Sequence, residues 1–155
     1  MNSLRYKRLI RRAAAYAPPP PVTLDDVLSG PPRAILVTGG TGFIGSGMVR
    51  GLLAAGAHVR SLDNDSRGQR QRFRDLEGEK RLELIEGDVR DPAAVAAAIA
   101  GVDSVLHLAY VNGTEFFYSA PELVLDVGVK GMINVVDACR AEGVRRLVLA
   151  SSSEV

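Results

Sequence analysis

From residue 34 onward, short apolar runs alternate with longer stretches in which apolar residues recur every three to four positions. The run at 34–38 is apolar throughout, which is typical of a strand buried on both faces of a parallel sheet. A helix is expected from 42 to 55, followed by a strand at 58–62. The packed side of this helix is expected to carry Ile44, Met48, Val49, Leu52 and Leu53.

The same alternation continues through the second half of the chain. The segment 64–80 is strongly charged and predicts a loop with a short, exposed helix. Strands and helices are then expected in turn at 82–86, 91–100, 102–108, 121–141 and 146–151. Strand–helix alternation with crossovers of this length indicates right-handed β-α-β units. The predicted fold is therefore α/β, a doubly wound, Rossmann-like parallel sheet of about five strands.

The chain divides into two unequal parts. Residues 1–32 are expected to form a basic tail and a Pro-rich linker, because the run Pro18–Pro21 favours an extended polyproline conformation. Residues 33–155 are expected to form one domain, since 155 residues are too few for two ordinary ones.

The sharpest local signal is Thr38-Gly39-Gly40-Thr41-Gly42-Phe43-Ile44-Gly45, between the first expected strand and helix. Gly39, Gly42 and Gly45 recur every three residues, and Gly40, Gly42 and Gly45 also fit a G-x-G-x-x-G spacing. Such glycines let backbone N–H groups approach a pyrophosphate, and the helix N-terminus adds partial positive charge. The motif predicts a dinucleotide site; the alternative is a glycine-rich turn that binds nothing.

Asp63 closes the second expected strand, 18 residues after Gly45. An acidic side chain there can accept hydrogen bonds from the adenosine ribose and would repel a 2′-phosphate. NAD is therefore the expected cofactor, and NADP is less favoured. Arg60 and Arg67 lie close enough in sequence to leave NADP binding open. The alternative for Asp63 is a strand-end carboxylate that only faces water.

Five segments, at 38–45, 62–64, 86–91, 106–109 and 150–155, resemble in order the signature segments of the NAD-dependent epimerase/dehydratase family of extended short-chain dehydrogenases/reductases. The resemblance covers residues 34–155 and is specific for the family rather than for one sugar. It implies the N-terminal, NAD-binding part of a sugar-nucleotide epimerase or dehydratase that acts by transient hydride transfer. The chain is expected to stop before the last strands and the substrate region.

The resemblance also implies roles for individual residues along the cofactor. They are Gly39, Gly42, Phe43, Ile44 and Gly45 at the pyrophosphate, Asp63 and Asn64 at the adenosine ribose, Asp88 and Val89 at the adenine, and Leu108, Ala109 and Tyr110 along the passage to the nicotinamide. For Asp88, the alternative is an aspartate in a turn after a strand.

Ser152 matches the active-site Ser/Thr of the family, which hydrogen-bonds the reacting sugar hydroxyl. Its place at the carboxyl end of the fifth expected strand is where ligands lie in parallel sheets. The alternative is a polar residue that merely ends a strand.

The sequence departs from the family pattern in two places. Gly128 stands where the family usually has Asn, which puts the nicotinamide site in doubt unless this glycine permits close packing. The family's general base is a Tyr four residues before a Lys, and none of the four tyrosines, Tyr6, Tyr16, Tyr110 and Tyr118, has a Lys at that spacing. Whether this chain is an enzyme is left open; the alternatives are a non-catalytic dinucleotide-binding module or a truncated remnant that needs another chain.

Composition limits the cellular compartment and the binding partners that can be expected. A net charge of +1 gives no basic field for nucleic acid, and no apolar run reaches the length of a membrane span. The single cysteine, Cys139, cannot form an internal disulfide, which fits the cytoplasm. His58 and His107 lack partners at ligand spacing, so no metal is expected. A nucleotide sugar is the expected partner of a completed chain, and the edge strand at 146–151 predicts a homo-oligomer.

Overall fold

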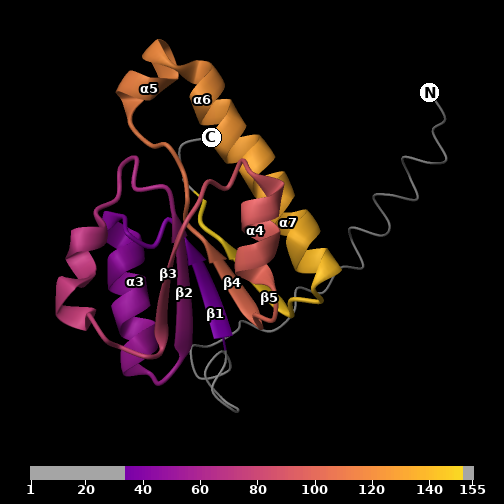
Figure 1. Ribbon diagram of the computed structural model, residues 1–155. Helices are drawn as coiled ribbons and strands as arrows, with labels where there is room; N and C mark the ends of the chain where they lie inside the picture. The colour runs from indigo at the N-terminus through magenta and orange to yellow at the C-terminus, as the bar shows by residue number, and fades with distance from the viewer. Residues whose placement is uncertain (1–33, 152–155) are drawn as a thin grey trace, which may run out of the picture.

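The computed structural model describes residues 34–151, so the tail and linker expected at 1–32 and the candidate Ser152 lie outside it. The described residues form a five-stranded sheet in the order β3-β2-β1-β4-β5, and every neighbouring pair is parallel (Figure 1). The strands are β1 (Ala34–Thr38), β2 (His58–Asp63), β3 (Leu82–Glu86), β4 (Ser104–His107) and β5 (Arg146–Leu149). The predicted Rossmann-like α/β fold is confirmed.

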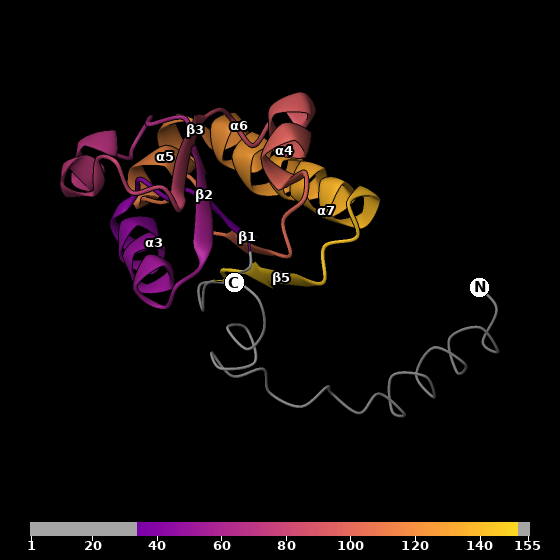
Figure 2. The same ribbon diagram turned by 60° about the horizontal axis from the view of Figure 1, so that its bottom comes forward.

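Helices cover both faces of this sheet (Figure 2). One face carries α3 (Phe43–Ala54) and the short 3-10 helix η1 (Arg70–Leu76), and the other carries α4 (Pro92–Ile99) and α7 (Met132–Ala141). Between β4 and α7 the chain forms α5 (Thr114–Ser119), α6 (Pro121–Leu125) and the π-helical turn η2 (Asp126–Gly131).

Two hydrophobic cores explain why β1 is apolar from Ala34 to Val37. Ile35 and Val37 pack toward α3 and Phe73 of η1, whereas Leu36 packs toward α4 and α7. Successive side chains of a strand point to opposite faces, so a central strand needs apolar residues at every position. All three side chains are fully buried.

The expected packed face of α3 was partly wrong. Val49 is buried, but Ile44 and Met48 are exposed. The buried stripe of the helix begins at Gly45, whose lack of a side chain lets the helix approach the preceding turn. This close approach turns Ile44 and Met48 to the flank of the helix.

Two other elements differ from the expectation. The short helix in the charged segment is not simply exposed, because Phe73 of η1 is buried in the core. The helix α5 was not predicted; it has no buried residue, so no apolar period marks it. The long helix expected at 121–141 is confirmed: α6, η2 and α7 follow one another without a break, and only the middle part, which contains Gly128, is π-helical.

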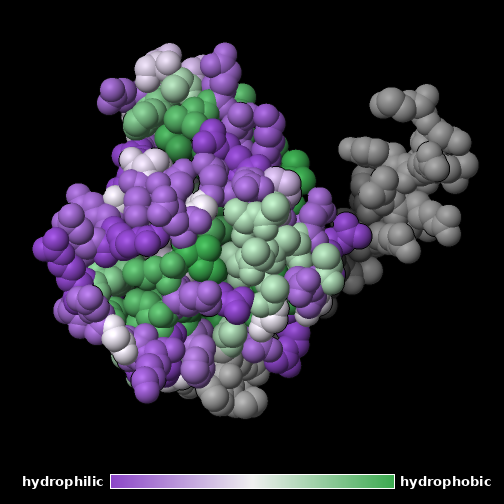
Figure 3. Space-filling model, viewed as in Figure 1, coloured by the Kyte–Doolittle hydropathy of each residue, from purple (hydrophilic) through white to green (hydrophobic). Residues whose placement is uncertain are grey.

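Both edge strands expose apolar surface. Leu147, Val148 and Leu149 of β5 are between 38% and 51% exposed. Beside β3, a groove has apolar residues of η1 and of the strand together with charged residues in its lining, and its apolar part corresponds to the green surface between α4 and η1 in Figure 3. Within residues 34–151, no helix is long and apolar enough to cross a membrane.

Candidate cofactor site

The turns that follow β1, β2, β3 and β4 open into one cleft. Nine of the residues expected at the cofactor line this cleft: Gly39, Gly42, Asp63, Asn64, Asp88, Val89, Leu108, Ala109 and Tyr110. Their place at the carboxyl ends of parallel strands is where ligands bind in doubly wound sheets.

The glycine-rich turn is built by close backbone contacts. Gly39 has a φ of +71°, and a Cβ on it would lie 2.9 Å from the backbone of Ala109. A Cβ on Gly45 would lie only 2.1 Å from the Gly39 carbonyl oxygen. A side chain at either position would therefore push apart the strand, the turn and the helix.

The first turn of α3 is free to meet an anion. Its N-cap, Gly42, supplies no side-chain hydrogen bond, and the first turn contains no acidic residue. The backbone N–H groups at a helix start lack partners within the helix and carry partial positive charge. Phe43 and Ile44 expose their side chains here and do not line the cleft, whereas Gly45 is buried beneath the turn.

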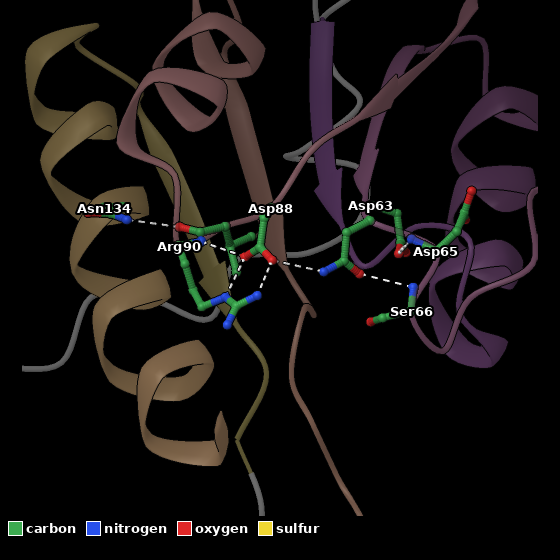
Figure 4. A network of polar contacts seen from close by, with 8 residues as sticks. Asp63, Asp65, Ser66, Asp88, Arg90 and Asn134 are labelled. Atoms are coloured by element: carbon green, nitrogen blue, oxygen red, sulfur yellow. Dashed lines mark hydrogen bonds and ion pairs between the residues drawn. The ribbon is translucent and has the colours of Figure 1, made fainter. Parts of the chain in front are cut away.

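Asp63 ties the glycine turn to the loop after β2. One of its carboxylate oxygens accepts the Thr41 N–H at 3.0 Å. The other accepts the Asp65 N–H at 2.9 Å (Figure 4). Asp65 lies at a left-handed φ of 53° and accepts the Thr41 hydroxyl at 2.7 Å. Because each carboxylate oxygen has a second lone pair, Asp63 retains acceptor capacity toward the cleft.

Asp88 accepts hydrogen bonds from two side chains, one neutral and one positively charged. Asn64 Nδ2 donates to it at 2.9 Å, and Arg90 Nη2 donates to the same oxygen at 2.6 Å (Figure 4). Hydrogen bonding from Arg90 lowers the pKa of Asp88 to about 2. Asp88 is therefore a fixed anion at neutral pH, within reach of the loop that carries Asp63.

Val89 is fixed from the opposite side by α7. Asn134 Nδ2 donates to the Val89 carbonyl oxygen at 2.9 Å. A Cβ on Gly131 would lie 2.8 Å from Val89 Cγ2, so the helix passes directly against this residue. The expected adenine wall is thus part of a sheet-to-helix contact.

A buried histidine supports the floor of the cleft. Thr38 Oγ1 lies 2.7 Å from His107 Nδ1 and also accepts the N–H groups of Leu108 and Ala109, both at 3.2 Å. The two N–H groups occupy both lone pairs of the Thr38 hydroxyl oxygen, so Thr38 donates its single proton to Nδ1. We therefore assign His107 the neutral tautomer protonated at Nε2. Burial lowers the pKa of His107, which agrees with this neutral state.

Tyr110 rests on the glycine that departs from the family pattern. A Cβ on Gly128 would lie 2.6 Å from Tyr110 Cε2, so the tyrosine ring occupies the space left by the missing side chain. The expectation that Gly128 permits close packing is confirmed, and the ring stays half-exposed at the mouth of the cleft.

Comparison with known proteins decides the family. Residues 35–155 match the sequence model of the family described as NAD dependent epimerase/dehydratase. The chain belongs to this family.

Other members show how broad the family is. The chain is 39% identical over 126 residues to cinnamoyl-CoA reductase 1 of Oryza sativa subsp. japonica. This match covers 80% of the present chain and 36% of the reductase. The structure of Thermus thermophilus UDP-glucose 4-epimerase in complex with NAD superposes with a TM-score of 0.69 at 36% identity, over 77% of this chain and 37% of the other.

A UDP-glucose 4-epimerase from Stenotrophomonas maltophila, with bound NAD and formylated UDP-arabinopyranose, gives a TM-score of 0.73 at 28% identity. That match covers 79% of this chain and 38% of the epimerase. The present chain therefore spans less than two-fifths of the length of the relatives it matches.

Sequence reasoning missed several residues of the site of this family member. Val111 and Val127 also line the cleft, and Asn134 and His107 support its walls. Arg67, which the sequence named only for NADP, lines the cleft as well. Asn134 lies 45 residues from its partner Val89, so no local spacing predicts their contact.

Proposed function

We propose that this chain binds NAD in the cleft and is the cofactor-binding portion of a nucleotide-sugar epimerase or dehydratase acting by transient hydride transfer. The observation that carries the proposal is the meeting of nine expected cofactor residues in one cleft at the carboxyl edge of the sheet. The similar epimerase from Thermus thermophilus, whose structure is a complex with NAD, supports the same cofactor.

The residues of the cleft fit a dinucleotide. The uncapped start of α3 provides N–H groups for a pyrophosphate, beside a turn where glycine leaves room for close approach. Asp63 has acceptor capacity left for the two ribose hydroxyls of an adenosine. Asp88, ionised above a pKa of about 2, can accept a hydrogen bond from an exocyclic amino group such as that of adenine.

When bound, NAD supplies the capacity to take a hydride from a carbon that bears a hydroxyl and to return it. The chain's part in that reaction is to hold and orient the cofactor, through Gly39, Asp63, Asp88 and Tyr110. Ser152, which lies outside the described residues, is the proposed hydrogen-bond partner of the reacting hydroxyl. The Tyr–Lys pair implied by the family is absent from residues 1–155.

A second candidate is a carbonyl reductase or alcohol dehydrogenase acting on another small molecule. The 39% identity to cinnamoyl-CoA reductase 1 favours it. The two candidates share the cofactor site and differ in the substrate. Assays of the protein purified from its source would separate them: UDP-glucose converted with catalytic NAD favours the first, and stoichiometric oxidation of a reduced nicotinamide by a CoA thioester favours the second.

The cofactor proposal is tested by titration calorimetry with NAD and NADP on wild type and on Asp63→Asn. Loss of a charged acceptor should weaken NAD binding by about 10- to 100-fold, while binding of NADP is less affected. The ratio of the two affinities does not depend on the fraction of active protein. Asp75→Asn is the matched control, since this exposed carboxylate pairs with Arg50 outside the cleft. An unchanged ratio in Asp63→Asn would remove Asp63 from the cofactor site.

A further inference from the structure

The charges of the cleft do not balance those of a dinucleotide. Two of the described lining residues, Asp63 and Asp88, are acidic, and Arg67 is the only Lys, Arg or His among the described residues that line the cleft. Arg90 neutralises Asp88 but does not itself line the cleft. A pyrophosphate would add two negative charges, which backbone N–H groups offset only in part.

The backbone at Arg67 is held against the glycine turn. Gln69 donates its N–H to the Thr41 carbonyl oxygen at 3.1 Å. At Gly68, an added Cβ would lie 1.8 Å from Thr41 Oγ1, so the loop touches the turn where α3 is about to begin. Arg67, which precedes this glycine, is thus anchored beside the proposed pyrophosphate position.

The side chain of Arg67 reaches across the cleft to the opposite bank. Its Nη1 donates to the Asn112 carbonyl oxygen, and its guanidinium carbon lies 4.9 Å from the centre of the Phe116 ring. Both partners belong to the segment that follows β4. Arg67 therefore bridges two loops that are separated by 45 residues in sequence.

These contacts are weak enough to be exchanged. The hydrogen bond is exposed, and an exposed cation–π contact is worth about 0.5–1 kcal/mol. The helix α5 has no fully buried residue, and Phe116 packs against the core while only partly buried. A pyrophosphate offers a guanidinium two charged acceptors in a geometry that matches its fork, a stronger interaction than either contact it would replace.

We propose that Arg67 is the counter-ion of the dinucleotide pyrophosphate. In the free protein its guanidinium bridges to Asn112 and Phe116; on binding, it turns to the pyrophosphate oxygens and releases α5. Arg67 is thus a binding residue that links cofactor occupancy to the freedom of segment 112–119. This inference rests on the proposed NAD function.

The test compares wild type with Arg67→Met, Arg67→Lys and Arg140→Met by titration calorimetry against NAD, NADP and adenosine. Arg140 is 81% exposed on α7 and does not line the cleft, so its replacement removes the same charge elsewhere. Arg67→Met should weaken NAD binding about tenfold or more, because it loses a charged hydrogen bond. It should change the affinity for adenosine, which has no phosphate, by no more than about twofold. Arg67→Lys should retain most of the affinity, and Arg140→Met all of it.

Each other result overturns the inference. Unchanged NAD affinity in Arg67→Met would show that the pyrophosphate does not use this residue. An equal loss for adenosine would assign Arg67 a structural role in the loop. A loss for NADP alone would make it a 2′-phosphate contact. If wild type bound neither NAD nor adenosine, the cofactor proposal would fall together with this one.

Release of α5 has its own readout in hydrogen exchange. NAD should speed the exchange of amides in 112–119 in wild type, while Arg67→Met should exchange them fast with or without NAD. Slower exchange in wild type on binding NAD would mean that α5 stays in place, and would refute the transfer of Arg67.

Discussion

Two glycines of α3, only two positions apart, should respond to alanine in opposite directions. A Cβ on Gly45 would lie 2.1 Å from the Gly39 carbonyl oxygen and 2.8 Å from Gly40 Cα. A Cβ on Gly47 would meet no heavy atom within 4 Å. The two substitutions add the same methyl group to the same helix, so they differ only in what that group meets.

The magnitudes follow from two opposing effects. Alanine is favoured over glycine inside a helix by about 0.5–1 kcal/mol, and Gly47→Ala should gain this amount. Gly45→Ala has the same gain, but overpacking commonly costs about 1–3 kcal/mol. The contact at 2.1 Å is with backbone, which cannot move aside as a side chain end can, so the upper part of that range applies. Gly45→Ala should therefore destabilise the protein by about 1–2 kcal/mol.

Urea denaturation followed by circular dichroism at the helix band measures both variants. For a small domain with a slope of about 1–3 kcal/mol/M, the two midpoints should separate by roughly 1 M, with Gly47→Ala above wild type and Gly45→Ala below it. If both variants were stabilised alike, the close approach of α3 to the glycine turn would not exist in solution.

Three further predictions concern the core and the cleft. The unfolding free energy should decrease as the pH drops below about 6.5, by up to about 1.4 kcal/mol per pH unit, because the unfolded chain takes up a proton that buried His107 resists. His107→Gln should flatten this slope in urea titrations at several pH values, since the other histidine, His58, is exposed. Gly128→Ala should not lower the urea midpoint, because the Tyr110 ring that it displaces is half-exposed, but it should change tyrosine fluorescence. Ser61→Ala should leave stability unchanged or raise it by about 1 kcal/mol, measured by thermal unfolding, because this buried hydroxyl has no hydrogen-bond partner in the described part of the chain.

The strands and the glycine turn could be predicted because their signals are local. A central strand such as β1 is apolar on both faces, and this requirement is visible in four consecutive residues, Ala34 to Val37. Gly39 and Asp63 follow directly from the ends of the first two strands. The family resemblance added the order of the remaining segments, and the fold and family are confirmed.

Other features could not be predicted because they depend on contacts between distant segments. The aromatic residue Phe73 lies in a charged run and is buried only because η1 folds back on the α3 face. The flank position of Ile44 depends on the close approach of Gly45 to the turn. The contacts of Arg67 and Asn134 join residues 45 positions apart, a separation at which periodicity carries no information.

The two carboxylates of the cleft are held by different partners, and this difference predicts how the two ends of the cleft respond to salt. Asp63 is held by backbone N–H groups of Thr41 and Asp65, which stay in place as long as the turn is folded. Asp88 is held mainly by Arg90, whose side chain is 40% exposed, so salt screens that pair. Rising salt should therefore loosen the proposed adenine end before the ribose end. In NMR titrations with sodium chloride, shifts near Asp88 should precede any near Asp63, and simultaneous shifts would contradict this division.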